Sequence, residues 1–412
     1  IDMLYPPGAS ARIPIIAVSG TNGKTTTTRM IAHIVKQMGY KVGYTTTDGV
    51  YIQNQMMVRG DCTGPKSAEF VLRDPTVDFA VLECARGGIL RAGLGFQNCD
   101  IAVVTNVAED HLGLQGIDTL EKLARVKAVA ANTVPESGHV ILNADDDLVY
   151  QMKKEVKGKV SLFSLDENNP RIREHCKTGG VAAIYEHGYI TIQKGSWKIR
   201  VEKVTDIPIT FSGKAIFNIA NTLAATLAAY LSDFKTEDIR QALHTFIPSP
   251  AMTPGRMNMF HFKDFNVMLD YAHNTHGLQA IGKFVEAQDA PLKVGIIAGV
   301  GDRRDEDIIA LGEESAKIFD EIIIRQDKNL RGRTEEEMIR LITQGIRNIK
   351  PDMDVKDFRK ESDAIDYAMQ NAQKDSFIVI ISDVVPDALE QVKHYKDVED
   401  GVILAEQKDV AN

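Results

Sequence analysis

The sequence predicts an α/β protein with two domains, each built on a mainly parallel β-sheet flanked by helices. Short apolar segments typical of buried strands alternate with segments typical of helices, which is the pattern of a helix-covered parallel sheet. This alternation occurs twice, on either side of a proline-rich segment at residues 246–256. The 412 residues also exceed the size of one ordinary hydrophobic core.

The first alternation occupies about 150 residues. The predicted strands are residues 13–18, 79–82, 101–105 and 139–142, and the predicted helices are residues 26–38 and 120–131. Residues 160–210 then show β-branched and aromatic alternation with glycine turns, which indicates a small β-rich subregion of hairpins. An Ala- and Leu-rich segment at residues 222–231 indicates a buried helix.

The segment "FIPSPAMTPGR" contains three prolines and a glycine, and we interpret it as a domain hinge. Beyond it the predicted strands are residues 267–269, 293–298, 321–324 and 377–381, and the predicted helices are residues 277–287 and 308–319. We therefore divide the chain into a lead-in at residues 1–14, a central P-loop domain at residues 15–252 and a smaller Rossmann-like α/β domain at residues 253–412.

The composition narrows the classes of function. It is 44% hydrophobic and 25% charged, as in ordinary soluble domains. The net charge of −9 argues against a general basic surface for nucleic acid. We find no apolar segment of membrane-spanning length and no secretory signal, and the four cysteines form no C-x-x-C pair. We therefore expect a cytoplasmic protein with reduced thiols.

The segment "VSGTNGKTTTTRM" (residues 18–30) joins the first predicted strand to the first predicted helix. Its glycines allow backbone N–H groups to turn inward, the helix N-terminus adds a dipole, and a lysine adds a positive charge, so we predict a phosphate-binding loop. A standard P-loop has a further glycine where Val18 stands, so this loop is a shortened form. The alternative is a glycine-rich turn that binds nothing. The predicted nucleotide-binding residues are Gly20, Thr21, Asn22, Gly23, Lys24, Thr25 and Thr26.

Three residues are candidate Mg²⁺ ligands. Thr25 follows the loop lysine, and its hydroxyl is placed to bind Mg²⁺ between phosphates. Glu83 follows a predicted strand, so its carboxylate lies at a carboxyl end, where doubly wound sheets bind ligands. His111 follows "TNVAED" after another strand. The alternatives are a solvated carboxylate at Glu83 and a structural imidazole at His111.

The loop "GTNGKTTTTRM" resembles the nucleotide loop of the Mur ligase superfamily, which includes folylpolyglutamate synthetases. A narrower resemblance, to the Mur-ligase half of cyanophycin synthetases, covers residues 1 to about 390. It rests on the segments "GYTTTDGVYI", "GDCTGPKSAEFVLRDPTVDFAVLECARGGILRAGLGF", "NVAEDHLGLQGIDTLEKLARVKA", "LNADD", "PGRMN", "LDYAHN" and "GDRRDEDI".

This resemblance implies an ATP- and Mg²⁺-dependent amide ligase that forms an acyl phosphate. The implied reaction joins the α-amino group of arginine to the β-carboxylate of an aspartate at a growing chain end. Alternatives are a glutamate-adding ligase similar to folylpolyglutamate synthetase, and an ATP-binding module without ligase activity. The resemblance also implies an upstream ATP-grasp domain as a partner, and we expect a homo-oligomer.

The resemblance assigns roles to further residues. Asn218 and Asn221 would face adenine, and Asp270 would bind the ribose hydroxyls. Lys127 corresponds to a lysine that many Mur ligases carbamylate, although a solvated helix lysine is the alternative. Arg256 and His273 would approach the phosphates once the second domain closes. The predicted catalytic residues are Lys24, Glu83, His111, Lys127, Arg256 and His273.

An acidic cluster follows one strand of the second domain in "VGDRRDEDI" (residues 300–308). Its carboxylates are candidates for binding the guanidinium of an incoming arginine. They are equally suited to the first turn of the helix that follows, where the helix dipole favours negative charge.

Overall fold

A computed structural model describes residues 12–110, 112–327 and 330–402 of the chain. It divides into two compact units, one ending at Ile247 and the other beginning at Pro248, and each is described by itself. The finer boundary between residues 252 and 253 stays a prediction. Residues 1–11 of the predicted lead-in lie outside the described residues.

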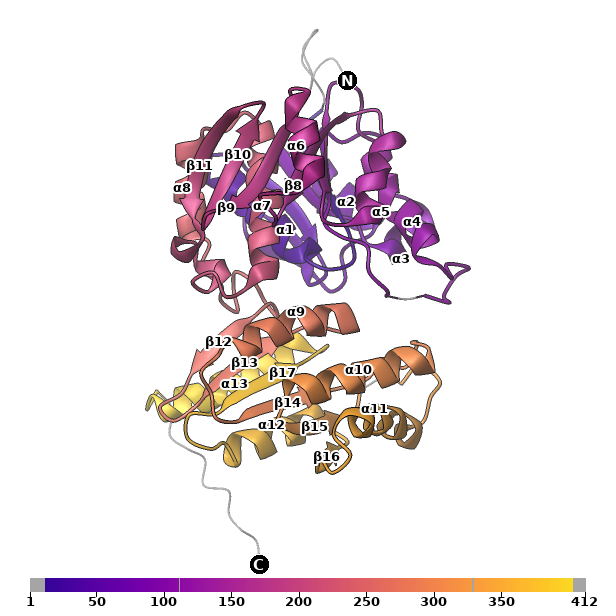
Figure 1. Cartoon of the computed structure of the whole chain (residues 1–412), viewed down its shortest axis with the longest axis vertical. Coiled ribbons are helices and arrows are strands. Elements are labelled where there is room, and N and C mark those ends of the chain that lie inside the picture. The colour runs from indigo at the N-terminus through magenta and orange to yellow at the C-terminus, as the bar shows by residue number, and fades with distance from the viewer. Residues whose placement is uncertain (1–11, 111, 328–329, 403–412) are drawn as a thin grey trace, which may run out of the picture. The chain divides into compact units, whose positions relative to one another are not determined.

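Unit 1 contains an 11-stranded sheet in the order β11-β10-β9-β8-β7-β6-β1-β5-β2-β3-β4 (Figure 1). Its strands are β1 (Ile15–Ser19), β2 (Val42–Thr46), β3 (Gly49–Ile52), β4 (Gln55–Arg59), β5 (Phe79–Glu83), β6 (Ile101–Val104), β7 (His139–Asn143), β8 (Lys159–Ser164), β9 (Val181–Glu186), β10 (Tyr189–Lys194) and β11 (Trp197–Lys203). Its α-helices are α1 (Lys24–Gln37), α2 (Pro65–Arg73), α3 (Arg86–Ala92), α4 (Leu120–Asn132), α5 (Asp147–Gln151), α6 (Pro170–Lys177), α7 (Ile216–Leu231) and α8 (Thr236–Thr245). Short 3₁₀ turns lie at Met152–Lys154, Val204–Asp206 and Pro208–Thr210.

The sheet of unit 1 is parallel from β9 to β2 and ends in antiparallel hairpins at both edges. Side chains of α2, α4, α5 and α6 share one hydrophobic core with the strands. Helices α1, α7 and α8 pack against other strand surfaces and against one another. Strand β1 is buried along its whole length, which explains why its sequence is a continuous apolar segment.

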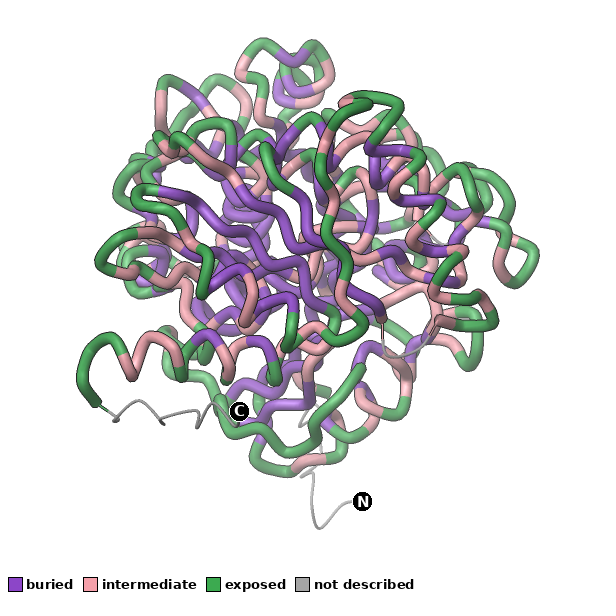
Figure 2. Tube along the Cα trace, turned by 90° about the horizontal axis from the view of Figure 1, so that it is seen from below, coloured by how far each residue is buried: buried purple, intermediate pink, exposed green. Residues whose placement is uncertain are grey.

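Unit 2 contains a six-stranded sheet in the order β12-β13-β17-β14-β15-β16, parallel except for the β12–β13 pair. Its strands are β12 (Asn258–His261), β13 (Asn266–Asp270), β14 (Lys293–Ile297), β15 (Glu321–Arg325), β16 (Val355–Phe358) and β17 (Phe377–Ile381). Its helices are α9 (Thr275–Glu286), α10 (Asp305–Ile318), α11 (Glu335–Ile349), α12 (Glu361–Gln370) and α13 (Val385–Glu399). Helices α12 and α13 cover one core, and α10 packs against α9, α11 and β14. In Figure 2 buried segments of the chain are drawn in purple and exposed segments in green.

The α/β class is confirmed, and some predicted elements differ in extent or setting. The predicted hairpins of residues 160–210 include β9–β10 and β10–β11, but these strands extend the main sheet, and the parallel strand β8 and helix α6 precede them. The helix predicted at residues 222–231 begins six residues earlier, at Ile216. Both asparagines predicted near adenine therefore lie on α7.

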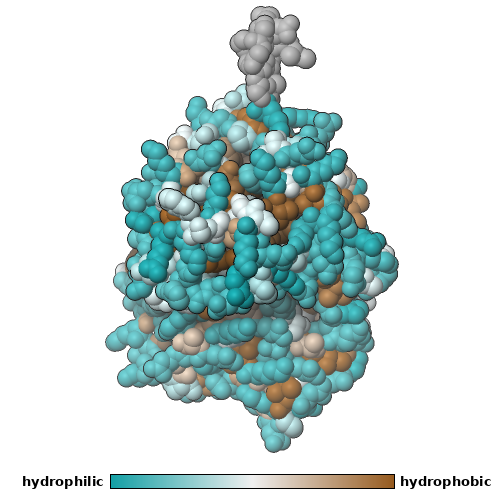
Figure 3. All heavy atoms as spheres, turned by 45° about the horizontal axis from the view of Figure 1, so that its top comes forward, coloured by the Kyte–Doolittle hydropathy of each residue, from teal (hydrophilic) through white to brown (hydrophobic). Residues whose placement is uncertain are grey.

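The surface and the cysteines agree with the composition. The face drawn in Figure 3 is mainly hydrophilic, with small hydrophobic patches between. All four cysteines are free and buried. Within the described part of the chain, no helix combines the length and apolar character needed to cross a membrane.

Candidate nucleotide and metal site

The predicted phosphate loop connects β1 to α1 at residues 20–23. Strand β1 lies between β5 and β6 and runs parallel to both, so the carboxyl ends of these three strands lie at one edge of the sheet. Helix α1 begins there with Lys24. A helix N-terminus at the carboxyl edge of a parallel sheet is a favoured place for an anion.

Two loop glycines have conformations and neighbours that exclude a larger side chain. Gly20 has φ 142° and Gly23 has φ 85°. A Cβ atom at Gly20 would overlap the hydroxyl of Thr105, and one at Gly23 would overlap the carboxamide oxygen of Asn221. Both glycines are therefore required by positive φ and by close approach.

Residues after β6 hold the loop in place. The backbone N–H of Thr21 donates to the backbone oxygen of Asn106 at 2.9 Å, and the N–H of Asn22 donates to the Asn106 side-chain oxygen at 2.9 Å. The backbone oxygen of Asn22 accepts from Thr105 Oγ1 at 2.7 Å and from Asn106 Nδ2 at 3.0 Å. The sequence analysis missed both supporting residues, although polar residues directly after the buried strand "IAVV" are a usable signal.

Two of the three predicted metal ligands are in contact. Thr25 Oγ1 donates to Glu83 Oε2 at 2.9 Å, and both side chains are almost fully buried. A hydroxyl and a carboxylate are hard oxygen ligands, so the pair fits Mg²⁺. Glu83 is therefore not the solvated carboxylate of the alternative. The third predicted ligand, His111, lies outside the described residues.

Two lysines lie beside the loop. Lys24 Nζ donates to the backbone oxygen of Thr21 at 2.8 Å. Lys127, on α4, is 4% exposed, and its Nζ donates to the backbone oxygen of Gly20 at 2.7 Å. The pKa of Lys127 is lowered to about 7, chiefly by burial and also by the positive charges of Lys24 and Arg86, while Asp110 opposes the lowering. The alternative of a solvated lysine at this position is wrong.

The two predicted adenine contacts lie near the start of α7. Thr26, the last residue of the predicted nucleotide loop, is buried on α1. Asn221 adjoins Gly23, and its Nδ2 donates to Asn218 Oδ1 at 3.1 Å. Asn218 Nδ2 donates to the backbone oxygen of Ile209 at 2.9 Å. Asn221 therefore adjoins the loop, Asn218 contacts Asn221, and the contact of both residues with adenine stays a prediction.

Unit 2 brings its three predicted site residues together around Tyr271. Asp270, at the end of β13, accepts from the backbone N–H of Met257 at 2.9 Å. Burial raises the pKa of Asp270, while nearby Arg256 and neighbouring N–H groups oppose the rise. The Arg256 guanidinium lies 4.6 Å from the centre of the Tyr271 ring, and the rings of Tyr271 and His273 are 5.1 Å apart.

The acidic cluster at the start of α10 is paired with the chain's own arginines. Asp302 contacts Arg303 and Arg331, and Asp305 contacts Arg333. Glu306 and Asp307 contact Arg304. Asp305, Glu306 and Asp307 also form the acidic first turn of α10. This arrangement favours the helix-stabilising interpretation of the cluster over a guanidinium pocket.

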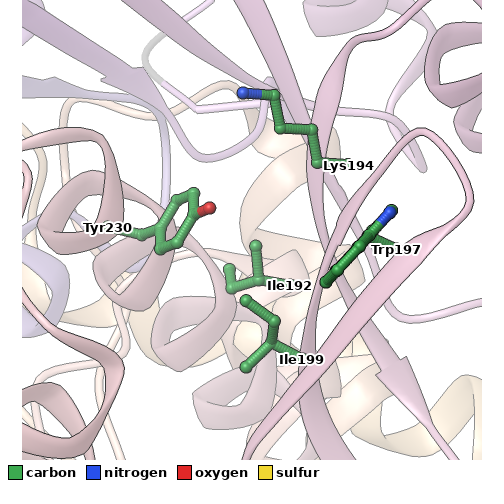
Figure 4. A pocket seen from close by; sticks show the side chains of 5 residues that line it. All are labelled: Ile192, Lys194, Trp197, Ile199 and Tyr230. Atoms are coloured by element: carbon green, nitrogen blue, oxygen red, sulfur yellow. The ribbon is translucent and has the colours of Figure 1, made fainter.

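An apolar pocket of about 370 Å³ lies elsewhere on unit 1 (Figure 4). It is lined by Ile192, Lys194, Trp197, Ile199 and Tyr230. Tyr230 lies nine residues beyond Asn221 on α7, which is about 14 Å along a helix axis. The pocket is therefore separate from the phosphate loop.

Comparison of the sequence with known families gives two matches in order along the chain. The Mur ligase middle domain matches residues 18–229, and the Mur ligase glutamate ligase domain matches residues 255–384. Cyanophycin synthetase from Geminocystis herdmanii is 50% identical over 395 residues, which are 96% of this chain and 45% of that protein. The chain thus spans less than half the length of this curated relative.

Two solved structures have a similar fold. A bifunctional folylpolyglutamate synthase/dihydrofolate synthase with Mn, AMPPNP and L-glutamate bound aligns with a TM-score of 0.68 at 20% identity, covering 93% of this chain and 90% of that one. A UDP-N-acetylmuramoyl-L-alanyl-D-glutamate–2,6-diaminopimelate ligase aligns with a TM-score of 0.56 at 22% identity, covering 91% and 74%. At these identities the likeness concerns the fold alone.

Proposed function

Because the chain belongs to the Mur ligase family, we propose that it is an ATP-dependent amide ligase. The observation that carries this proposal is the contact between Thr25 and Glu83 directly behind the glycine loop. This contact brings the predicted nucleotide loop and two proposed hard oxygen ligands together at one edge of the sheet.

The proposed reaction activates a carboxylate with ATP. A carboxylate oxygen attacks the γ-phosphorus, the bond to the bridging oxygen breaks, and ADP leaves. The amine nitrogen then attacks the acyl phosphate carbonyl, a proton leaves the nitrogen, and phosphate is expelled as the amide forms. Negative oxygens crowd together in both steps, so the site requires positive charge more than a nucleophilic side chain.

The chain's own residues have distinct proposed roles. Lys24 neutralises phosphate charge at the start of α1. Thr25, Glu83 and His111 would hold Mg²⁺, which would supply further charge neutralisation. Lys127, once carbamylated, adds a negative group beside Gly20. Asn218 and Asn221 bind adenine, Asp270 binds the ribose hydroxyls, and Arg256 and His273 act at the phosphates.

We propose arginine as the amine and an aspartate side chain at a polymer end as the carboxylate. The support is the 50% identity to cyanophycin synthetase over almost the whole chain. The chain corresponds to 45% of that relative, and we further propose that an ATP-grasp domain cooperates with it. As a separate proposal, we expect the protein to be a homo-oligomer. Free, buried cysteines fit a cytoplasmic location.

The test is ATP-dependent phosphate release with a short aspartate oligomer and, in turn, arginine, lysine, glutamate and alanine. Stimulation by arginine alone supports the proposal. The Lys24→Ala variant is the negative control, because any phosphate that it releases comes from contaminating ATPases. Stimulation by glutamate with a folate-like acceptor would instead indicate that the chain is a glutamate-adding ligase. Nucleotide binding without stimulation by any amine, even with an added ATP-grasp protein, would indicate a binding module.

A further inference from the structure

The hairpin of β10 and β11 forms one wall of the apolar pocket of unit 1. Lys194 lies opposite Trp197 across this hairpin, next to its turn. Two residues further along β10, Ile192 lies opposite Ile199. Residues opposite each other in an antiparallel pair share a face, and every second residue returns to that face. The four side chains therefore line the pocket from one side, and Tyr230 of α7 lines it from the other (Figure 4).

Two helices pack near this hairpin and leave its turn end uncovered. Helix α7 packs against β8, β9 and β10. Helix α8 packs against β11 close to Val201, whose backbone oxygen accepts from Arg240 Nε at 2.7 Å. Along β11 the exposed fraction rises from 1% at Val201 to 38% at Ile199 and 79% at Trp197. The pocket is therefore open to a ligand at the turn end of the hairpin.

Two polar groups belong to the otherwise apolar lining. Lys194 supplies an ammonium group, and Tyr230 supplies a hydroxyl that is directed toward the hairpin in Figure 4. Within the part of the chain that the structure describes, neither of these side chains has a hydrogen bond or an ion pair. An ammonium group can only donate hydrogen bonds, and a phenol hydroxyl can donate one. The two groups are therefore suited to an oxygen anion.

The size and the walls of the pocket suit a small molecule with an apolar body. Its volume of about 370 Å³ falls within the range of about 300–1,000 Å³ that is typical of small-molecule sites. The indole of Trp197 and the phenol of Tyr230 offer flat surfaces on which a ring can pack. Because the indole is largely exposed, a bound ring removes apolar surface from water.

We propose that this pocket is a second ligand site of unit 1, which binds a small molecule with a flat apolar body and a carboxylate. The apolar body lies against Trp197, Ile192 and Ile199, and the carboxylate accepts hydrogen bonds from Lys194 and Tyr230. An amine with the same body meets the like charge of the lysine, and a neutral amide lacks the charge-assisted hydrogen bond. The site is separate from the proposed nucleotide site and does not depend on it.

The experiment uses the fluorescence of Trp197, which is the only tryptophan of the chain and therefore reports on the pocket directly. The full chain is titrated with 3-phenylpropionate, 3-phenylpropionamide and 3-phenylpropylamine, which share a phenyl body and differ in charge. Lys194→Ala removes the ammonium group, and Tyr230→Phe removes the hydroxyl. Lys198→Ala is the matched control, because Lys198 lies on the opposite face of the same hairpin, where it pairs with Glu186. A thermal melt of each variant reports on folding.

We expect the carboxylate to cause a saturable blue shift of the Trp197 emission, because the indole is transferred out of water. The amide should bind about fivefold more weakly, as for the loss of an exposed ion pair, and the amine more weakly still. Lys194→Ala should bind the carboxylate and the amide about equally, whereas Lys198→Ala should keep the preference. Tyr230→Phe should weaken carboxylate binding about threefold. In ligand-observed NMR, Trp197→Ala should lose saturation transfer to the carboxylate.

Several results overturn the proposal. Without a saturable shift by the carboxylate, the pocket binds no such molecule. Equal binding of the carboxylate and the amide, or stronger binding of the amine, contradicts recognition of negative charge. Undiminished carboxylate binding by Lys194→Ala or by Tyr230→Phe places the anion elsewhere. These results leave the ligase proposal intact, and a parent protein that binds no nucleotide overturns the ligase proposal without affecting this site.

Discussion

Lys127 Nζ and the backbone oxygen of Gly20 are 2.7 Å apart, although 107 residues separate them in the sequence. Helix α4 packs against β1, which brings this amine to the first residue of the loop. The surroundings exclude water and contain other cations, so the amine holds its proton weakly. An uncharged amine beside a phosphate loop is suited to covalent modification by carbon dioxide.

Carbamylation of Lys127 should depend on pH in a defined direction. Its pKa is lowered from 10.5 to about 7, so the neutral amine that reacts with carbon dioxide becomes abundant as pH rises through 7. With ¹³C-labelled bicarbonate, a carbamate signal should therefore be weak at pH 6 and strong at pH 8. Lys122→Ala, which changes an exposed lysine of the same helix, should keep the signal.

Lys127→Ala should lose both the carbamate signal and most of the activity. A short added carboxylic acid should restore part of the activity by supplying the missing negative group. Full activity of Lys127→Ala would remove this residue from the proposed mechanism.

Replacing Lys24 with alanine should reduce ATP turnover by about 100-fold or more, because a preorganised positive group at the phosphates is lost. The fold should survive, since the ammonium group is only partly buried and contacts one loop carbonyl. Turnover assays and circular dichroism check the two statements. Turnover within a few-fold of the parent would refute the loop assignment.

Glu83→Gln should raise the Mg²⁺ concentration needed for half-maximal turnover by about 10- to 100-fold. The amide can still accept from Thr25, but it lacks the negative charge that the cation requires. His111→Ala should act in the same direction if this residue completes the ligand set. Glu69→Gln, at an exposed acid of α2 paired with Arg73, is the control and should behave as the parent.

Gly20→Ala should lower the free energy of unfolding by about 2–4 kcal/mol, from positive-φ strain together with overlap on Thr105. Gly39→Ala is the matched comparison, because Gly39 has φ 90° but nothing within 4 Å of an added Cβ. It should cost only about 1 kcal/mol. Urea titrations give both values, and equal losses would show that the contact with Thr105 contributes nothing.

The sequence predicted the strand–loop–helix unit to within two residues at each end, because a buried strand, loop glycines and a helical pattern agree locally. It did not predict the β2–β3–β4 hairpins. The threonine-rich sequence of residues 45–47 is also typical of a loop. Strand β4 is exposed along its whole length, so it lacks the alternation of apolar and polar residues that predicts a strand. The Thr25–Glu83 contact was foreseeable because Glu83 ends one predicted parallel strand and Thr25 begins the helix after another, so both lie at the same edge of the sheet.

Other parts of the site depend on distant contacts that no local pattern records. Thr47 Oγ1 lies 3.2 Å from Thr25 Oγ1 only because β2 lies beside β5 in the sheet, and three elements (β3, β4 and α2) separate these strands in the chain. In the sequence Arg29 is one polar residue within a predicted helix. It is buried beside Tyr44 and Tyr51 only because the β2–β3 hairpin packs against this helix. The sequence therefore indicated which residue types could bind phosphate and metal, but the contacts between their side chains depend on tertiary packing.

The residues that contact the phosphate loop are translated at very different times. Thr105 and Asn106 emerge about 80 residues after the loop, and Asn221, which adjoins Gly23, emerges about 200 residues after it. On a ribosome the loop therefore stays incomplete until most of unit 1 has been made, since domains fold as units and long-range strand pairing is slow. Nascent chains ending before α7 should accordingly lack the finished loop, so tight capture by an immobilised nucleotide would report that this unit has been assembled.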